Sequence, residues 1–260
     1  ADSRQVYKGL NLGAGKITKK EMRGVPHHLL SVASPRRTFS VQQYQKEARK
    51  AIESIFKKGK TPFLVGGSPL YIYVVTDGWL MPEVKPDPKL RKRLEKLSAA
   101  QLFSRLRKLD PRRAKTIEQK NKRRLVRALE IVLKTGKPVP KLRKRPLPYP
   151  VLFLGIKREP DALAARIRKR LVERLRRGMV REVQNLKKSG VPLKRLEAFG
   201  LEYRFISRYL QDRISKSEME ERIVRSSLDF ARRQMAWFKK DPRIRWIRGF
   251  KEAESLVKGV

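Results

Sequence analysis

A short string at the start of the chain brings several kinds of reactive group together. Asp2-Ser3-Arg4-Gln5 places a carboxylate, two hydrogen-bonding side chains and a guanidinium at consecutive positions, with Tyr7 close behind. Such a carboxylate can accept a proton from a nucleophile while its neighbours orient the substrate. On these residues alone Asp2 could equally end a strand or cap the next turn, so both interpretations stay open.

A second string follows an apolar run. Pro62-Phe63-Leu64-Val65 precedes Gly66-Gly67-Ser68, and this order predicts a short buried parallel strand that leads through a loop into a helix. Open α/β sheets bind ligands at the carboxyl ends of their strands, where backbone N–H groups and a hydroxyl would lie here. A tight turn before a helix explains the same residues equally well.

Two other patterns do not predict a site. Gly13-Ala14-Gly15-Lys16 looks like part of a phosphate loop, but that motif needs Gly and Ser or Thr where this chain has Leu10 and Ile17. The chain has no cysteine, and its two histidines, His27 and His28, are adjacent. We therefore expect no zinc site and no metal centre built from protein ligands alone.

The spacing of apolar residues predicts an α/β scaffold around these strings. Ser40 and Gln43 form a capping box for a helix that ends before Gly59. Further strands are predicted over residues 151–156 and 243–247.

Two more helices are predicted in the second half of the chain. One follows Asp161 as its N-cap and carries a stripe of Arg166, Arg170 and Arg174 beside an apolar face. The other begins at a capping box of Ser217 and Glu220, and its end places Trp237 and Phe238 in the core.

The middle of the chain differs in composition. Pro82, Pro86 and Pro88 mark a boundary, and residues 85–147 carry 23 Lys and Arg against 5 Asp and Glu. We predict an α/β fold whose core comprises residues 1–82 and 148–260, with a basic, all-helical insertion over residues 83–147.

The net charge indicates the kind of partner. The 260 residues include 66 Lys and Arg against 25 Asp and Glu, a formal charge of +41. A field of this size favours a polyanion such as nucleic acid. The most apolar stretch, residues 63–75, is interrupted by Gly66 and Pro69, so we expect no membrane span. No secretory signal is visible, and we expect a cytoplasmic protein.

In combination, the motifs resemble those of the tRNA dimethylallyltransferase (isopentenyl-tRNA transferase) family. The resemblance covers nearly the whole chain and rests on five ordered segments: Ala1-Asp2-Ser3-Arg4-Gln5-Val6-Tyr7, Gly24-Val25-Pro26-His27-His28-Leu29, Leu64-Val65-Gly66-Gly67-Ser68, Arg124-Leu125-Val126-Arg127-Ala128-Leu129-Glu130 and Ala231-Arg232-Arg233-Gln234-Met235-Ala236-Trp237-Phe238.

The resemblance implies a fold, a reaction and partners. It implies a P-loop-NTPase-like parallel-sheet core and transfer of the dimethylallyl group from dimethylallyl diphosphate to N6 of adenosine 37 of tRNA. The implied cofactor is Mg²⁺, and the implied RNA partner is the anticodon stem-loop. We also expect no membrane partner and a monomeric enzyme.

The resemblance also implies roles for individual residues. The catalytic residues would be Asp2 as general base, Ser68 where the family usually has Thr, and Arg170 as the cation that holds the diphosphate. A third RNA-contacting stretch departs from the family, because Gly-Leu-Glu replaces the common Gly-Tyr. The residues implied in binding tRNA are Asp2, Ser3, Arg4, Gln5, Ser68, Arg91, Arg123, Arg124, Leu125, Val126, Arg127, Gly200 and Arg204.

The largest departure concerns the phosphate loop. Family members carry a strand and a Gly-rich loop ahead of the Asp-Ser-Arg-Gln string, and this sequence shows neither. We expect a fragment of a longer reading frame, or else a relative that binds tRNA without prenylating it, and in both cases poor turnover.

Two other functions remain as alternatives. The chain could be a basic RNA-binding protein without transferase activity, which explains the charge but not the Asp2 and Gly66-Gly67-Ser68 strings. It could also prenylate free adenine nucleotides, although such a substrate would not need the long basic insertion.

Overall fold

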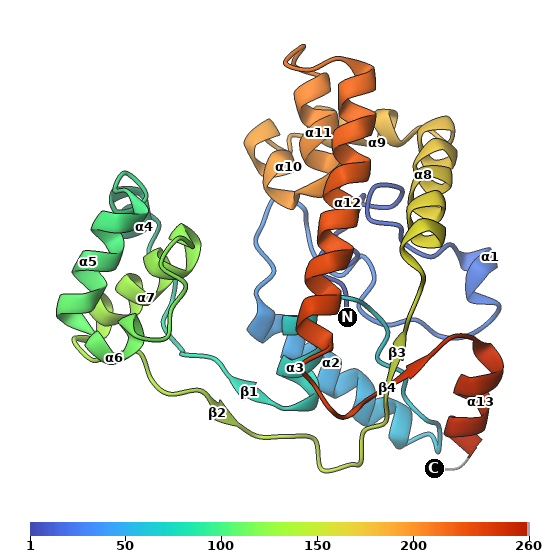
Figure 1. The fold of residues 1–260 in the computed structure, drawn as a ribbon, viewed down its shortest axis with the longest axis horizontal. Helices are drawn as coiled ribbons and strands as arrows, with labels where there is room; N and C mark the ends of the chain where they lie inside the picture. Colours follow the sequence, from blue (N-terminus) through green and yellow to red (C-terminus); the bar gives the residue numbers. More distant parts are fainter. Residues whose placement is uncertain (259–260) are drawn as a thin grey trace. The chain divides into compact units, whose positions relative to one another are not determined.

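A computed structural model describes residues 1–258 of the chain, which are helical for the most part (Figure 1). None of the helices in this part is both long enough and apolar enough to cross a membrane. The elements are α1 (Lys19–Met22), α2 (Val41–Phe56), α3 (Pro69–Thr76), β1 (Trp79–Leu80), α4 (Pro88–Leu94), α5 (Ala99–Leu109), α6 (Pro111–Ala114), α7 (Lys122–Thr135), β2 (Arg143–Lys144), β3 (Phe153–Ile156), α8 (Pro160–Arg176), α9 (Met179–Lys188), α10 (Leu193–Phe199), α11 (Leu201–Tyr209), α12 (Lys216–Phe238), β4 (Ile244–Ile247) and α13 (Phe250–Lys258).

The chain forms two compact units. The core unit comprises Ala1–Asp77 and Pro146–Val260, and the helical unit comprises Gly78–Arg145. The composition predicts boundaries after residues 82 and 147. Both lie a few residues further along the chain than the boundaries in the structure, which follow Asp77 and Arg145.

A small parallel sheet lies in the core unit. β3 pairs with β4 from Phe153 opposite Ile244 to Ile156 opposite Ile247, which confirms both strands predicted for this half of the chain. Gly155 allows the close approach, because a Cβ there would lie 2.7 Å from side-chain atoms of both Ile244 and Trp246.

The buried strand predicted over residues 62–65 is wrong. The structure shows no strand there, and the Phe63 and Val65 residues are 70% and 77% exposed. A strand needs a neighbour that continues the hydrogen-bond ladder. Within the described chain, the only hydrogen bond to residues 62–65 is the one that the Ala1 amino group donates to Val65 O, at 2.5 Å.

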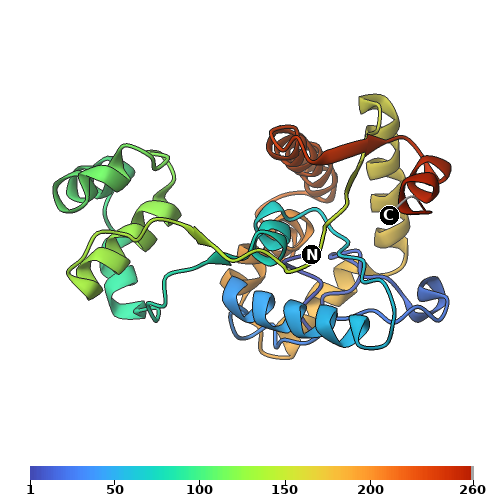
Figure 2. The same ribbon diagram turned by 90° about the horizontal axis from the view of Figure 1, so that it is seen from below.

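The helix predicted after Ser40 is confirmed. Ser40 Oγ accepts from Gln43 N at 3.1 Å, and Gln43 Oε1 accepts from Ser40 N at 2.8 Å, so the capping box is complete. The helix buries Tyr44, Ala48 and Ile52, and it packs against α3. Figures 1 and 2 show these two helices side by side.

Two predicted helix starts are wrong by two residues. α12 begins after Ser215, whose Oγ accepts from Glu218 N at 3.1 Å, and not at a box of Ser217 and Glu220. α8 has Glu159 as its N-cap in place of Asp161, because Pro160 at the first helical position has its backbone already set for a helix.

The end of α12 differs from the predicted packing. Trp237 is exposed, while Gln234 and Phe238, four residues apart, are half-buried. Residues at this spacing share one side of a helix, so Trp237 lies outside the buried side.

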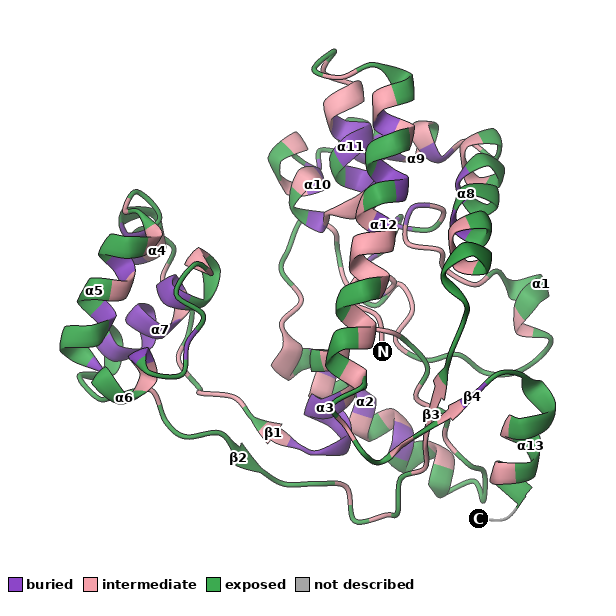
Figure 3. Ribbon diagram, viewed as in Figure 1, coloured by how far each residue is buried: buried purple, intermediate pink, exposed green. Residues whose placement is uncertain are grey.

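The helical unit has a core of its own. α4, α5 and α7 surround an apolar cluster, and Figure 3 shows buried positions alternating with exposed ones along each of these helices. The buried members of the cluster are Leu90, Leu94, Leu102, Leu106, Ile117, Leu125, Val126, Ala128, Leu129 and Val132. β1 and β2 pair antiparallel, with Trp79 opposite Lys144.

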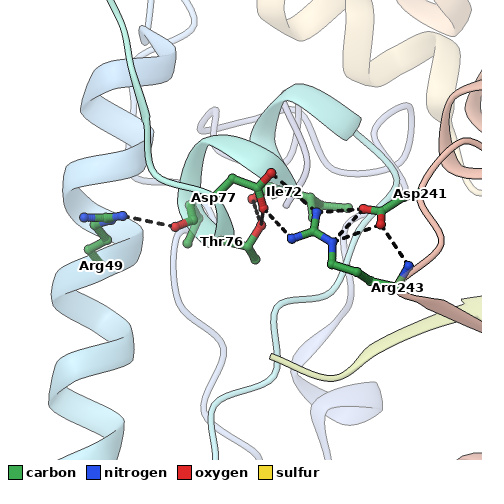
Figure 4. A network of polar contacts seen from close by, with 7 residues as sticks. Arg49, Ile72, Thr76, Asp77, Asp241 and Arg243 are labelled. Carbon is green, nitrogen blue, oxygen red and sulfur yellow. Dashed lines mark hydrogen bonds and ion pairs between the residues drawn. The ribbon is translucent and has the colours of Figure 1, made fainter. Parts of the chain in front are cut away.

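A polar network joins the end of α3 to the start of β4 (Figure 4). Arg243 donates from Nη1 to Asp77 Oδ1 at 3.0 Å and from Nη2 to Asp241 Oδ2 at 2.7 Å. Its guanidinium carbon also lies 4.6 Å from the centroid of the Phe153 ring. The hydrogen bonds from Arg243 lower the pKa of Asp241 to about 2, against the opposing effect of burial. One arginine thus connects three segments of the core unit.

Candidate active site

The Asp2 string forms a turn that leads into an isolated parallel bridge between Tyr7 and Ala33. Asp2 Oδ1 accepts from Arg4 N at 2.6 Å and from Gln5 N at 3.1 Å. The other carboxylate oxygen, Oδ2, has no hydrogen bond to any described residue. Asp2 therefore caps its turn and still offers an oriented oxygen, so the two interpretations of this residue are compatible.

Arg4 and Gln5 hold the turn to other parts of the core unit. Arg4 Nε donates to Phe199 O at 2.5 Å, and its guanidinium carbon lies 5.7 Å from the Phe199 ring centroid. Gln5 Nε2 donates to Ala14 O at 3.4 Å and to Gly15 O at 3.3 Å. Both side chains are thus engaged in positioning the turn.

The Gly66-Gly67-Ser68 loop lies directly against the Asp2 string. Ser68 N donates to Ala1 O at 3.4 Å, and Gln234 Nε2 of α12 donates to Gly67 O at 2.5 Å. A Cβ on Gly66 would lie 2.2 Å from Ala1 O, and one on Gly67 would lie 2.1 Å from Gln234 Nε2. The fold therefore brings together three of the sequence segments that carry the resemblance, and Gly66 is needed for the contact because a Cβ there would meet the Ala1 backbone.

Ser68 is the polar side chain that this loop presents. It is the N-cap residue of α3, yet its hydroxyl makes no capping hydrogen bond. Its Oγ has no other hydrogen-bond partner among residues 1–258, so the hydroxyl can contact a ligand.

The arginine stripe of α8 approaches the same region. Arg170 is exposed, whereas Arg174 is half-buried and its Nη1 lies 3.5 Å from Glu202 Oε1 on α11. Burial lowers the pKa of Arg174, and the charge of Arg170 lowers it further. Burial raises the pKa of Glu202, and the charge of Asp2 adds to this effect. The charges of Asp2, Arg170 and Arg174 thus all act on Glu202.

The Gly13-Ala14-Gly15-Lys16 pattern does not bind phosphate through its leading amides. Asn11 N and Leu12 N donate to Glu182 Oε2 at 3.0 and 2.7 Å, and Gly13 N donates to Glu182 Oε1 at 3.1 Å. These amides would otherwise form an anion-binding concavity, and a carboxylate of the chain itself occupies it.

Two tyrosines lie near Asp2 that sequence reasoning missed. The Tyr44 and Tyr71 rings are 4.4 Å apart between centroids. Burial raises the pKa of Tyr71 to about 12, and the charge of Asp2 contributes to the rise. Burial also raises the pKa of Tyr44, with further contributions from Tyr71 and Asp2. Two protonated aromatic side chains thus lie within electrostatic reach of Asp2.

The third implied stretch joins α10 to α11. Gly200 has φ +77° and caps both helices, and Arg204 is exposed with its Nε donating to Glu197 O at 3.5 Å. Glu202 follows Gly200 by two residues and ends the Gly-Leu-Glu string. No local pattern indicated that its partner would be Arg174.

The residues implied in the helical unit fall into three groups. Arg91 donates from Nε and Nη2 to the two carboxylate oxygens of Glu130, both at 2.7 Å, and Arg127 Nη1 donates to Glu130 Oε2 at 2.5 Å. Leu125 and Val126 are buried in the apolar cluster, so their side chains are not available to RNA. Arg123 and Arg124 are exposed, so their guanidinium groups are available to RNA.

The Glu130 carboxylate is fully buried, yet its pKa is low. Burial by itself would raise the pKa. The hydrogen bonds from Arg91, the Asp87 amide and Arg127 outweigh burial and lower the pKa to about 2. Arg91 and Arg127 are therefore structural cations, each already held by a buried anion.

Similarity to known proteins covers almost the whole chain. A family model described as IPP transferase matches residues 5–241. A tRNA dimethylallyltransferase from Thermomicrobium roseum is 38% identical, over 95% of this chain and 76% of the relative. One from Synechococcus sp. (strain JA-3-3Ab) is 40% identical, over 95% of this chain and 73% of the relative.

Solved structures show the same similarity. The tRNA isopentenylpyrophosphate transferase of Bacillus halodurans superposes with a TM-score of 0.71 at 32% identity, covering 99% of this chain and 86% of that one. A eukaryotic dimethylallyltransferase crystallised acting on tRNA superposes with a TM-score of 0.74 at 26% identity, covering 91% of this chain and 62% of that one.

Proposed function

The chain belongs to the IPP transferase family, and from that premise we propose that it transfers a dimethylallyl group from dimethylallyl diphosphate to N6 of adenosine 37 in tRNA. The observation that carries the proposal is the oriented Asp2 carboxylate, with one oxygen held by two amides and the other without a partner among the described residues. The charges of Asp2 and Arg170 both act on Glu202, in the core unit that also presents the Ser68 hydroxyl.

The reaction needs a base because adenine N6 is a weak nucleophile, its lone pair being delocalised into the ring. N6 forms a bond to C1 of the dimethylallyl group while the bond from C1 to the diphosphate oxygen breaks, and the electron pair leaves with the diphosphate. Asp2 Oδ2 takes the N6 proton, and the amides of Arg4 and Gln5 keep the carboxylate oriented for this transfer.

The departing diphosphate needs cationic contacts. Arg170 is exposed, carries no ion pair among residues 1–258, and can donate two parallel hydrogen bonds to phosphate oxygens. Ser68 Oγ, which also lacks a partner within the described chain, would donate a further hydrogen bond to the diphosphate.

The residues present also fit Mg²⁺. The described part of the chain contains no group of three His, Cys, Asp or Glu side chains that could hold an ion. Mg²⁺ does not require such a group, because it binds through one or two protein oxygens together with phosphate oxygens and water. Ser68 Oγ, which makes no capping hydrogen bond, is the protein oxygen that would hold it, and Asp2 Oδ2 stays free to accept the N6 proton. When bound, the ion neutralises charge on the leaving diphosphate.

The helical unit supplies contacts to the RNA. Its exposed cations at the start of α7, Arg123 and Arg124, would bind phosphates of the anticodon stem, and Gly200 and Arg204 of the core unit would add a further contact. The target adenine must leave the stack of the anticodon loop, at a cost of a few kcal/mol that these contacts offset. We place this monomeric enzyme in the cytoplasm, with its tRNA substrate.

The test uses dimethylallyl diphosphate with an anticodon stem-loop that carries adenosines at positions 36 to 38. We expect mass spectrometry to detect one dimethylallyl group on the hairpin, none on a hairpin with guanosine at position 37, and none on AMP. Binding of the hairpin without transfer would favour a basic RNA-binding protein, the function that the charge of +41 alone supports. Transfer to AMP would instead indicate an enzyme that acts on nucleotides.

A further inference from the structure

A buried ion pair lies in the core unit beside the proposed site. Arg174 of α8 and Glu202 of α11 lie 3.5 Å apart, with side chains 15% and 11% exposed. Removing two opposite charges from water costs about as much as their attraction returns, so apolar residues of the same size would serve stability at least as well. The stability of the fold therefore does not explain this pair.

The position of Arg174 connects the pair to the catalytic turn. A Cβ on Gly15 would lie 2.1 Å from Arg174 Nη2, so the guanidinium packs directly on the Gly15 backbone. The Gly15 and Ala14 carbonyls in turn accept the hydrogen bonds from Gln5 of the Asp2 string. Arg174 is thus held on the loop that positions the turn.

The charges of Arg174 and Glu202 also act on Arg170, which lies one helical turn earlier on α8. Arg170 and Arg174 repel each other, and both attract Glu202. Arg170 has no ion pair within residues 1–258, whereas the charge of Arg174 is already met by Glu202. Arg166 of the same stripe is exposed in either case, so the carboxylate of Glu202 decides whether Arg174 is a further free guanidinium beside Arg170.

We propose that Glu202 sets the affinity of the site for diphosphate by neutralising Arg174 and holding it on Gly15, which leaves Arg170 as the free guanidinium. The inference rests on the proposed function. It gives the pair a role in turnover, because two free guanidinium groups would retain the diphosphate product, and product release limits many enzymes.

The test measures binding of inorganic diphosphate to the full chain by isothermal titration calorimetry. We expect Glu202→Gln to bind about tenfold more tightly than the unaltered chain, because it releases a second guanidinium for a charge-assisted hydrogen bond. Arg170→Met should bind at least tenfold more weakly than the unaltered chain. Unchanged or weaker binding by Glu202→Gln would overturn the inference, as would the absence of measurable binding by both the unaltered chain and Glu202→Gln.

A double variant covers the case in which Glu202→Gln does not fold. Arg174→Met with Glu202→Leu replaces the pair by apolar side chains of similar size, which buried pairs often tolerate. We expect it to melt within a few degrees of the unaltered chain and to bind diphosphate with the same affinity. Tenfold weaker binding by a folded double variant would mean that Arg174 itself holds the anion, which contradicts the inference.

The two proposals fail separately. Transfer to the hairpin together with unchanged diphosphate affinity in Glu202→Gln would contradict the role of Glu202 alone. Tighter diphosphate binding in that variant without transfer by the unaltered chain would contradict the proposed reaction and leave the charge-setting role in place.

Discussion

Two buried glutamates, one in each unit, hold arginines in opposite ways. Glu130 of the helical unit receives hydrogen bonds of 2.5 to 2.7 Å from Arg91, Arg127 and the Asp87 amide, and its pKa falls to about 2. Glu202 of the core unit lies 3.5 Å from Arg174, and burial raises its pKa. The Glu130 carboxylate thus accepts several short hydrogen bonds, whereas the Glu202 carboxylate is buried with fewer donors around it.

The difference indicates different uses of charge. The helical unit has 23 Lys and Arg against 6 Asp and Glu in 68 residues, whereas the remaining 192 residues have 43 against 19. The helical unit has about twice the net positive charge per residue of the rest of the chain. The arginines near its core therefore need a buried counter-charge, which Glu130 provides. In the core unit, the Glu202 carboxylate has fewer donors. The positive charge beside the site therefore depends on whether Glu202 is paired with Arg174. The contacts of Glu130 give it a structural role, whereas the role proposed above for Glu202 is in diphosphate binding.

The largest expected effect is the loss of the Glu130 anchor. Glu130→Ala leaves Arg91 and Arg127 without their buried counter-charge, and we expect the helical unit to lose about 3 to 5 kcal/mol of stability. Hydrogen exchange of the α7 amides measures this loss directly. The matched control is Glu118→Ala, which removes an exposed partner of Arg124 and should cost less than about 1 kcal/mol. Equal losses in the two variants would remove the distinction between the units.

A second prediction separates chemistry from RNA binding. Asp2→Asn keeps an oxygen to accept from the Arg4 and Gln5 amides but removes the proton acceptor. We expect dimethylallyl transfer to fall by about 100-fold or more, in line with general-base catalysis. Hairpin affinity should change less than about fivefold, the ~1 kcal/mol of one neutral hydrogen bond, because the Asn side chain keeps the turn in place. A parallel loss of binding would make Asp2 a structural residue.

The third prediction concerns acid. Since the folded-state pKa of Glu130 is depressed to about 2, the carboxylate stabilises the helical unit fully above its ordinary pKa of 4.5. This stability, roughly 3 kcal/mol or less at ~1.4 kcal/mol per pKa unit, is lost as the pH falls from about 4.5 to about 2. Hydrogen exchange of α7 at stepped pH should show the loss, and Glu130→Gln should show a flatter profile. An identical profile in the variant would contradict the assignment.

The smallest expected effect distinguishes the arginines of α7. Arg124 is exposed, so Arg124→Ala should weaken hairpin binding and reduce the slope of log affinity against log salt by about 1, without destabilising the unit. Lys251→Ala removes an exposed charge from α13 and is the control. If both variants reduce the slope equally, net charge and not the position of Arg124 determines the binding.

Local signals in the sequence predicted much of the fold. The Ser40 capping box, β3, β4 and a helical insertion all depend on residues close in the chain, and the structure has each of them. The start of α12 was ambiguous because Ser215 and Ser217 each precede a Glu by three residues. Capping by Ser215 was not distinguishable from local sequence, since both serines satisfy the same pattern.

Long-range pairing could not be predicted in the same way. Residues 62–65 have the composition of a strand, but a strand forms only when a neighbouring segment continues the hydrogen-bond ladder. Within the described chain that neighbour is Ala1, which donates a single hydrogen bond to Val65 O. The roles of Glu130, Glu182 and Glu202 likewise depend on partners on other helices or loops. The approach of Ser68 to the Asp2 string was indicated only by the family resemblance, and the contact of Gln234 with Gly67 was not predicted.

The most direct test of the account is hairpin binding at several salt concentrations. It compares an anticodon stem-loop with adenosines at 36 to 38 with the same stem carrying a scrambled loop. If the core unit recognises the adenosine, the matched hairpin should bind at least tenfold more tightly, about 1.4 kcal/mol, and keep this margin as salt rises. Equal binding of both hairpins, weakening together with salt, would show that charge alone binds the RNA and would contradict the account.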